Sequence, residues 1–239
     1  MTVNMTLEIC TNSYQSAKNA QIAGAKRIEL CSELSVGGIT PSYGLIHQII
    51  EELDIETFVL IRPRSGNFQY SEAEFDIIKK DIQICKDLGC HGIVSGVLNE
   101  DNTIDIKRTQ DLIALSKPLP FTFHRAFDVV PNPEKALEQL IKLGVHRILT
   151  SGQHPKAIDG IENLKALKEQ AKNRIILLAG SGINSQNAKL FKDAGFEELH
   201  ASASEVIHTV SSVYFGNTPQ TVSSITEIKA ILKTIDNEV

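Results

Sequence analysis

The sequence lacks tryptophan and contains only four tyrosines among its 239 residues. Proteins that bind single-stranded nucleic acid stack the bases on aromatic side chains, and carbohydrate binders often stack sugars in the same way, so this scarcity weighs against both functions. A stripe of lysine and arginine is also missing, and the net charge at pH 7 is −5. Because nucleic-acid phosphates are bound through basic surfaces, we expect no nucleic-acid partner.

Long apolar runs are absent as well. A membrane-spanning helix needs roughly 20 consecutive apolar residues, and no stretch approaches that length, so we expect no membrane segment. The first six residues have neither the basic nor the apolar segment of a secretion signal. A disulfide framework is not expected in a chain of this length with four cysteines, which are Cys10, Cys31, Cys85 and Cys90. Together these features favour a reducing cytoplasm.

Short apolar runs alternate with amphipathic helical stretches along the whole chain. The eight runs that we predict as strands are Leu7–Asn12, Arg27–Leu34, Phe58–Arg64, Gly92–Leu98, Phe121–Phe127, Arg147–Gly152, Ile175–Ser181 and Leu199–Ala203. Eight such units in a chain of this length predict an α/β fold, a single (β/α)8 TIM-barrel domain over residues 1–239. The main alternative, an open doubly wound sheet, usually has a glycine-rich loop after its first strand, and this chain lacks one there.

Capping residues indicate where the intervening helices begin and end. Thr40-Pro41 and Asn132-Pro133 each place an N-cap residue before a proline at the first helical position. Ser71 and Glu74 have the spacing of a capping box. Glycine, which closes a helix in the left-handed conformation, is expected to end four helices, at Gly24, Gly89, Gly144 and Gly195.

The C-terminal part of the chain is less regular. From about Glu205 to Ser224 the sequence is rich in serine and threonine and shows no clear periodicity. We therefore expect a long loop after the eighth strand, followed by a final helix over about Ile225–Ile235.

The first two predicted strands share one pattern, in which glutamate precedes cysteine by two residues. Residues two apart on a strand point to the same face, so Glu8 shares a face with Cys10, and Glu29 with Cys31. A buried carboxylate is costly unless it is paired, and we expect Arg62 to offset both glutamates. The pattern therefore indicates a site at the carboxyl ends of the strands, where TIM barrels carry their functional residues.

The two cysteines allow different roles, and the residues alone leave them open. Adjacent strands lie roughly 4.8 Å apart, so Cys10 and Cys31 are candidate ligands for one soft metal ion such as Cu(I). Either thiol is alternatively a nucleophile activated by a nearby arginine. Because alternate strands fill the layers inside such barrels, a stagger that separates the thiols and leaves them as plain core residues is the competing prediction.

A second group of polar residues predicts that the protein binds, or acts on, a small phosphorylated or carboxylated metabolite. The candidates for proton transfer are Glu8, Glu29, His124 and Asp128. The candidate anion-binding residues are Arg62, Arg64, Arg125, Ser151, Gly180, Ser181, Gly182 and Ser202. The glycine turn in this set precedes a predicted helix, whose N-terminus attracts anions. Since a metal carrier has no need of three arginines around its thiols, the residues alone favour this hypothesis over copper binding.

Taken together, these motifs resemble those of the CutC copper homeostasis family. The resemblance runs from about residue 6 to about 204 and rests on Glu8-Ile9-Cys10, Glu29-Leu30-Cys31, Gly37–Ser42, Arg62-Pro63-Arg64, Phe123–Asp128, Leu149–Gly152 and Gly180–Ile183. It implies a cytoplasmic (β/α)8 barrel that binds or traffics copper and often forms a homodimer. It also implies that Cys10 and Cys31 are ligands of Cu(I).

Overall fold

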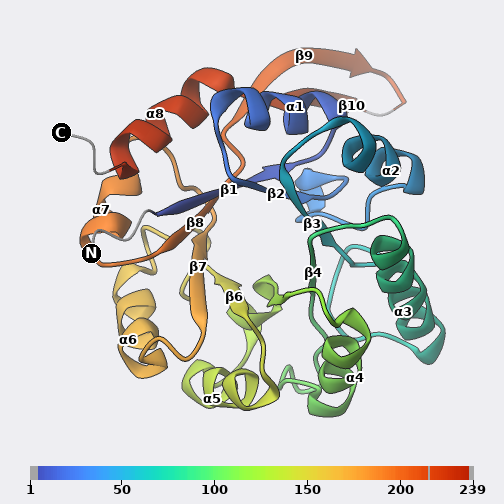
Figure 1. Ribbon diagram of the computed structural model, residues 1–239, viewed down its shortest axis with the longest axis vertical. Helices are drawn as coiled ribbons and strands as arrows, with labels where there is room; N and C mark the ends of the chain where they lie inside the picture. The colour runs from blue at the N-terminus through green and yellow to red at the C-terminus, as the bar shows by residue number, and fades with distance from the viewer. Residues whose placement is uncertain (1–4, 215, 237–239) are drawn as a thin grey trace.

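Eight parallel strands close into a barrel in the computed structural model, which describes residues 5–214 and 216–236 (Figure 1). In chain order they are β1 (Thr6–Thr11), β2 (Arg27–Leu30), β3 (Glu56–Leu60), β4 (Gly92–Ser95), β5 (Phe121–Phe123), β6 (Arg147–Thr150), β7 (Ile176–Gly180) and β8 (Glu198–Ala201). Each strand pairs with its neighbours in sequence, and β8 pairs with β1 to close the sheet. The structure thus confirms the predicted TIM barrel.

Helices surround the strands and cover the outside of the barrel (Figure 1). They are α1 (Tyr14–Ala23), α2 (Tyr43–Glu52), α3 (Glu72–Asp87), α4 (Ile106–Ser116), α5 (Pro133–Leu143), α6 (Ile161–Ala171), α7 (Ala188–Asp193) and α8 (Ile225–Ile235). Short 3-10 helices follow two strands, η1 (Leu34–Val36) after β2 and η2 (Arg125–Val129) after β5.

Most of the predicted helix boundaries are confirmed. Ser71 and Glu74 form the capping box at the start of α3, and Asn132 caps α5. All four predicted terminal glycines have positive φ angles. The prediction at Thr40 is wrong, because α2 begins after Ser42, whose hydroxyl accepts the cap hydrogen bond. The Thr40 hydroxyl instead accepts a hydrogen bond of 2.9 Å from the backbone N–H of Arg62 and so supports the end of β3.

The segment after β8 also differs from the prediction. Instead of a loop, it forms an antiparallel hairpin of β9 (Ser204–Ser212) and β10 (Gly216–Ser223), which lies outside the barrel beside α1 at the top of Figure 1. Val206 is 61% exposed and Ile207, its neighbour on the other face, is 60% exposed. Because neither face there is buried, the apolar alternation that reveals a half-buried strand is missing.

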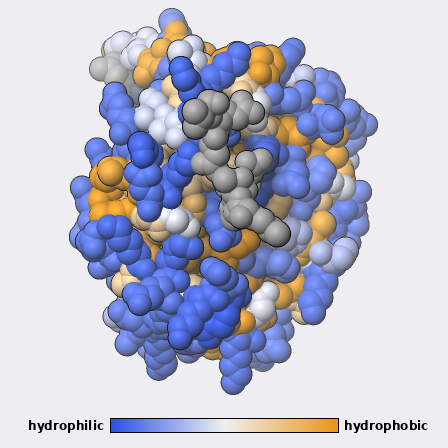
Figure 2. Space-filling view, turned by 60° about the vertical axis from the view of Figure 1, so that its left-hand side comes forward, coloured by the Kyte–Doolittle hydropathy of each residue, from blue (hydrophilic) through white to orange (hydrophobic). Residues whose placement is uncertain are grey.

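Apolar side chains fill the space between the strands and the helices, where Phe121, Phe123, Phe127 and Phe191 are the largest fully buried residues. A smaller apolar cluster lies inside the barrel and contains Cys10, Cys31, Phe58, Leu60 and Val94. On the face shown in Figure 2, hydrophilic residues predominate and hydrophobic residues occur in small groups between them. Among the residues that the structure describes, no helix is long and apolar enough to cross a membrane.

Candidate metal and anion site at the barrel mouth

A cavity of about 460 Å³ opens at the carboxyl ends of the strands. Strands β8, β1 and β2 supply an acidic wall, which we define as His200, Cys10 and Glu29. Residues that follow β3 and β5 supply a basic wall, defined as Arg62, His124 and Arg125. The apolar lining consists of Leu34, Val36, Leu60, Phe68, Val129 and Leu149. The cavity therefore offers chemically different groups on two sides.

The two thiols of the E-x-C patterns lie together. Cys10 Sγ is 3.7 Å from Cys31 Sγ and 3.4 Å from Glu29 Oε2, and all three residues are buried. The predicted stagger of neighbouring strands does not separate the sulfurs. The Cys31 thiol, burial and the nearby Glu29 together raise the pKa of Cys10 well above its usual range. Without a bound ion, the Cys10 thiol is therefore protonated at neutral pH.

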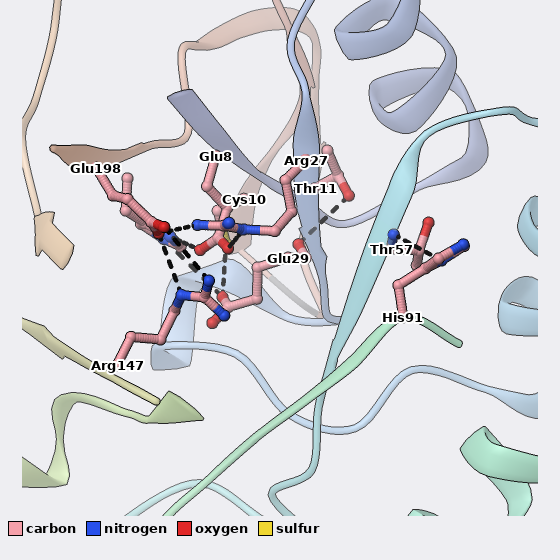
Figure 3. A network of polar contacts seen from close by, with 10 residues as sticks. Glu8, Cys10, Thr11, Arg27, Glu29, Thr57, His91, Arg147 and Glu198 are labelled. Atoms are coloured by element: carbon pink, nitrogen blue, oxygen red, sulfur yellow. Dashed lines mark hydrogen bonds and ion pairs between the residues drawn. The ribbon is translucent and has the colours of Figure 1, made fainter. Parts of the chain in front are cut away.

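Glu8 lies one layer below Cys10 and is paired with Arg27 rather than with Arg62. The β1–β2 register places Arg27 beside Glu8, and its Nε donates a hydrogen bond of 2.5 Å to Glu8 Oε2. Arg27 also donates to Glu198, which accepts a second hydrogen bond of 3.1 Å from Arg147 Nε (Figure 3). These four residues form a buried cluster with two positive and two negative side chains.

Electrostatics keep Glu8 ionised inside the barrel. Burial raises the pKa of Glu8, but the Arg27 charge and the hydrogen bond to His200 outweigh burial and hold the pKa at about 2. The strand pattern indicates that Arg27 faces the barrel interior, since residues 27, 29 and 31 are spaced by two and share one face. Glu198 and Arg147 gave no comparable signal, because their contact depends on how the barrel closes.

His200 connects the two glutamates. Its Nδ1 lies 2.8 Å from Glu8 Oε1, and its Nε2 lies 3.9 Å from Glu29 Oε2. Burial alone would lower the pKa of His200, but the charge of Glu29 and the contacts with Glu8 raise it. Burial also raises the pKa of Glu29. Sequence reasoning assigns His200 no role, because its contacts with Glu8 and Glu29 depend on how β8 closes the barrel against β1.

Arg62 is a buried cation that backbone carbonyls hold in place. Its Nη1 donates to the carbonyls of Val36 and Gly38 at 3.0 and 2.9 Å, and its Nη2 to that of Gly66 at 2.8 Å. The guanidinium lies over the ring of Phe68, 4.9 Å from its centroid. Within the described ranges 5–214 and 216–236, no carboxylate pairs with Arg62 within 4.0 Å. Backbone dipoles fix its position, but its charge is not neutralised.

His124 lies beside Arg62 in its neutral form. Burial and the Arg62 charge lower the pKa of His124 to about 3. Its Nδ1 accepts a hydrogen bond of 3.2 Å from the Ala126 N–H, so the ring proton is on Nε2. This Nε2 is buried and has no hydrogen-bond partner among the residues that the structure describes. At neutral pH, His124 is therefore a hydrogen-bond donor on the basic wall.

Asp128 and Arg125 also line the cavity, but both are engaged in local contacts. Arg125 Nε donates to Asp128 at 2.7 Å, and Arg125 Nη2 donates to the Ser151 hydroxyl at 2.8 Å. The same Asp128 carboxylate accepts hydrogen bonds from Thr150 and from the backbone N–H groups of Ser151 and Gln153. The catalytic role of Asp128 and the anion-binding role of Ser151 stay predictions.

Arg64 is one of three predicted anion-binding residues, with Ser151 and Gly180, that do not line the cavity. Its Nε donates to Glu74 at 2.5 Å, and its Nη2 donates to the Gln69 carbonyl at 2.7 Å. Arg64 is not among the residues that line the cavity. Of the Arg62-Pro63-Arg64 motif, only the first arginine reaches the basic wall.

The glycine turn after β7 contributes only part of its predicted anion site. Ser181, Gly182 and Ser202 line the cavity, whereas Gly180 does not. A Cβ at Gly180 would lie 2.6 Å from Leu149 and 3.1 Å from His200, so this glycine leaves room for the cavity wall. The following helix α7 has only six residues. The backbone N–H groups before it already donate to the side chains of Asn184, Asn187 and Glu227.

The model of the CutC family matches residues 5–205. The chain belongs to the CutC family. Among CutC relatives, the human copper homeostasis protein cutC homolog is 46% identical over 198 residues, which cover 82% of this chain and 72% of the human protein. The CutC family protein of Photorhabdus laumondii is 45% identical over 222 residues, covering 93% of this chain and 88% of the relative.

A solved CutC structure, from Streptococcus agalactiae, has the same fold. It is 36% identical to this chain, superposes with a TM-score of 0.78, and the match covers 83% of this chain and 98% of the other. The family assignment made from the motifs is therefore confirmed by sequence and by structure.

Proposed function

We propose that this CutC protein binds Cu(I) in the cytoplasm through the thiols of Cys10 and Cys31. The observation that carries the proposal is the 3.7 Å separation of the two sulfurs, which places both within reach of one ion. Thiolates are the ligands that Cu(I) prefers, and the human relative is named as a copper homeostasis protein homolog. The homodimer that the family resemblance implies stays a prediction.

The surroundings of the thiols fit a protein that takes up and releases copper. Cys10 lines the open cavity, whereas Cys31 is fully buried behind it. An ion must therefore enter through the cavity and meet Cys10 first. Because the pKa of Cys10 is raised, Cu(I) has to displace a proton to bind. The competition between proton and ion limits the affinity, which suits a protein that passes its ion on.

An anaerobic Cu(I) titration against a competing chelator tests this proposal. We expect one Cu(I) to bind to the wild type and a loss of affinity of more than about 100-fold in Cys10→Ala and in Cys31→Ala, since each removes a direct ligand. Cys85→Ala is the matched control, because Cys85 is equally buried but lies on α3. Equal Cu(I) affinity in all four proteins would rule out the two-thiol site.

Binding of a small anion is a second candidate function, and the unneutralised charge of Arg62 favours it. A carboxylate or phosphate near Arg62 and His124 would receive a cation and a neutral N–H donor. Glu29 and His200 on the acidic wall would then be the candidates for proton transfer. Fewer arginines are available to bind an anion than the sequence indicated, because Arg64 lies away from the cavity and Arg125 is paired with Asp128.

A thermal-shift screen with small carboxylates, sugar phosphates and sulfate tests the second function. A ligand at about 100 times its Kd adds roughly 2.7 kcal/mol to the stability of the protein, so we expect a clear rise in Tm for a matching anion. Arg62→Met should abolish the rise, and Arg64→Met, which alters the other arginine of the same motif, should retain it. A rise that survives in Arg62→Met, or no rise with any anion, would contradict this function.

A further inference from the structure

The acidic wall contains three different ligand groups close together. Cys10 Sγ, a Glu29 carboxylate oxygen and a His200 ring nitrogen all lie within 4.8 Å of one another. The Cys10–Glu29 separation is 3.4 Å, and the Glu29–His200 separation is 3.9 Å. Tetrahedral zinc with sulfur, nitrogen and oxygen ligands requires ligand–ligand distances of about 3.3–3.6 Å. The widest separation in the set is at most 4.8 Å, so side-chain movements of about 1 Å give the spacing of a metal centre.

The orientation of His200 is the second observation. Its Nδ1 is in contact with Glu8 at 2.8 Å, and Glu8 is in turn fixed by Arg27. Nδ1 therefore carries the proton when the ring is neutral, and Nε2 presents its lone pair toward Glu29. The 3.9 Å from Nε2 to Glu29 is too long for a hydrogen bond. Metal-binding histidines are commonly held by a carboxylate on their other nitrogen in this way.

The charges of the barrel interior fit a divalent ion. Beneath the acidic wall, the buried cluster of Glu8, Glu198, Arg27 and Arg147 is already neutral when all four side chains are ionised. A Cys10 thiolate and a Glu29 carboxylate add two negative charges, which a divalent cation neutralises. One sulfur, one nitrogen and one oxygen ligand suit an ion such as Zn²⁺ better than Cu(I), which favours sulfur.

We propose that Cys10, Glu29 and His200 form a binding site for a divalent transition-metal ion of the Zn²⁺ type. The cavity in front of the three ligands leaves a fourth coordination position for water or a small molecule, as in catalytic rather than structural zinc sites. This site shares Cys10 with the Cu(I) site but uses His200 and Glu29 in place of Cys31. The two ions therefore exclude each other.

The test uses Co²⁺ as a spectroscopic probe of the full-length protein under anaerobic conditions. We expect one Co²⁺ to bind with a thiolate-to-cobalt charge-transfer band and the visible bands of tetrahedral cobalt, and Zn²⁺ to displace it. His200→Gln and Glu29→Gln should each weaken Co²⁺ binding more than 10-fold. Cys31→Ala and the control Cys85→Ala, which alters a buried thiol on α3, should bind as the wild type does, and circular dichroism verifies that each variant folds.

The results with the two ions separate this inference from the proposed function. We expect Cu(I) binding to depend on Cys31 and not on His200, and Co²⁺ binding to depend on His200 and not on Cys31. Absence of the charge-transfer band in the wild type would overturn the inference whatever the variants do. Co²⁺ binding that is unchanged in His200→Gln, or lost in Cys31→Ala, would overturn it as well. None of these Co²⁺ results decides whether Cys10 and Cys31 bind Cu(I), which the Cu(I) titration tests separately.

Discussion

At the scale of single residues, the protein buries ionisable groups that depend on one another. Glu8 is ionised because Arg27 lies beside it, and His200 is oriented because Glu8 is ionised. Removing one partner leaves a buried charge uncompensated, which costs more than the pair itself contributes. The orientation of His200 in the cavity therefore depends on Arg27 and Glu8, although Arg27 does not line the cavity.

Replacing Arg27 tests this dependence. Arg27→Met leaves Glu8 without its cation, so we expect the free energy of unfolding in urea at pH 7 to fall by about 3–5 kcal/mol. Arg174→Met is the control, because it breaks an exposed pair with Glu138 and should have little effect. A small loss of stability in both variants would show that Arg27 does not stabilise the ionised form of Glu8.

Because of His124, we expect the free energy of unfolding to depend on pH in the acid range. Folding lowers the pKa of His124 from 6.5 to about 3, so the fold favours the neutral ring. Its contribution is complete above pH 6.5 and is lost as the pH falls toward 3. Between these values, we expect wild-type stability to fall by up to about 1.4 kcal/mol per pH unit more than that of His124→Gln.

Urea unfolding at several pH values measures this difference. His208→Gln is the control, because His208 is exposed on β9 and should retain the wild-type pH dependence. If the free energy of unfolding changes with pH equally in the wild type and in His124→Gln, the fold does not hold His124 in its neutral form.

At the scale of elements, small residues on the strands create room for the large groups inside the barrel. A Cβ at Gly92 on β4 would lie 2.5 Å from the ring of Phe58. Phe58 packs against both Arg27 and Arg147, with each guanidinium 5.0 Å from its ring centroid. The glycine thus positions an aromatic ring that supports the buried charged cluster.

Gly92→Ala tests this packing. We expect overpacking against Phe58 to lower the free energy of unfolding by about 1–3 kcal/mol. Gly44→Ala on α2 is the matched control, because no atom of the described residues lies within 4 Å of its added Cβ. Alanine also favours the helix there, so a gain of about 0.5–1 kcal/mol is expected. Equal changes in the two variants, measured by urea unfolding, would contradict the packing described here.

At the scale of the whole molecule, the fold extends beyond the region that defines the family. The family match ends at residue 205, yet α8 packs against α1 and α7 with Ile228, Ile231 and Ile235 buried. Ile231→Ala should cost about 2–5 kcal/mol of stability. Ile207→Ala on the exposed hairpin should cost less than about 0.5 kcal/mol. Thermal unfolding that is unaffected by Ile231→Ala would show that α8 is dispensable.

Local sequence patterns predicted the secondary structure, but they did not predict the contacts that form when the barrel closes. Strand alternation, helix caps and terminal glycines predicted the barrel, and the E-x-C spacing predicted which residues face its interior. The contact between Glu8 and His200 joins residues 192 positions apart and follows from the β1–β8 pairing. Pairing of Arg27 with Glu8 likewise needed the strand register, and so Arg62 was assigned in its place.

X-ray absorption spectroscopy at the copper edge of the Cu(I)-loaded protein counts the sulfur ligands of the bound ion. With Cys10 and Cys31 as ligands, the wild-type spectrum should show two sulfur neighbours around copper, and Cys31→Ala should show one. A first coordination shell of nitrogen and oxygen alone, or an identical spectrum in Cys31→Ala, would contradict the claim that the two thiols at the barrel mouth bind copper.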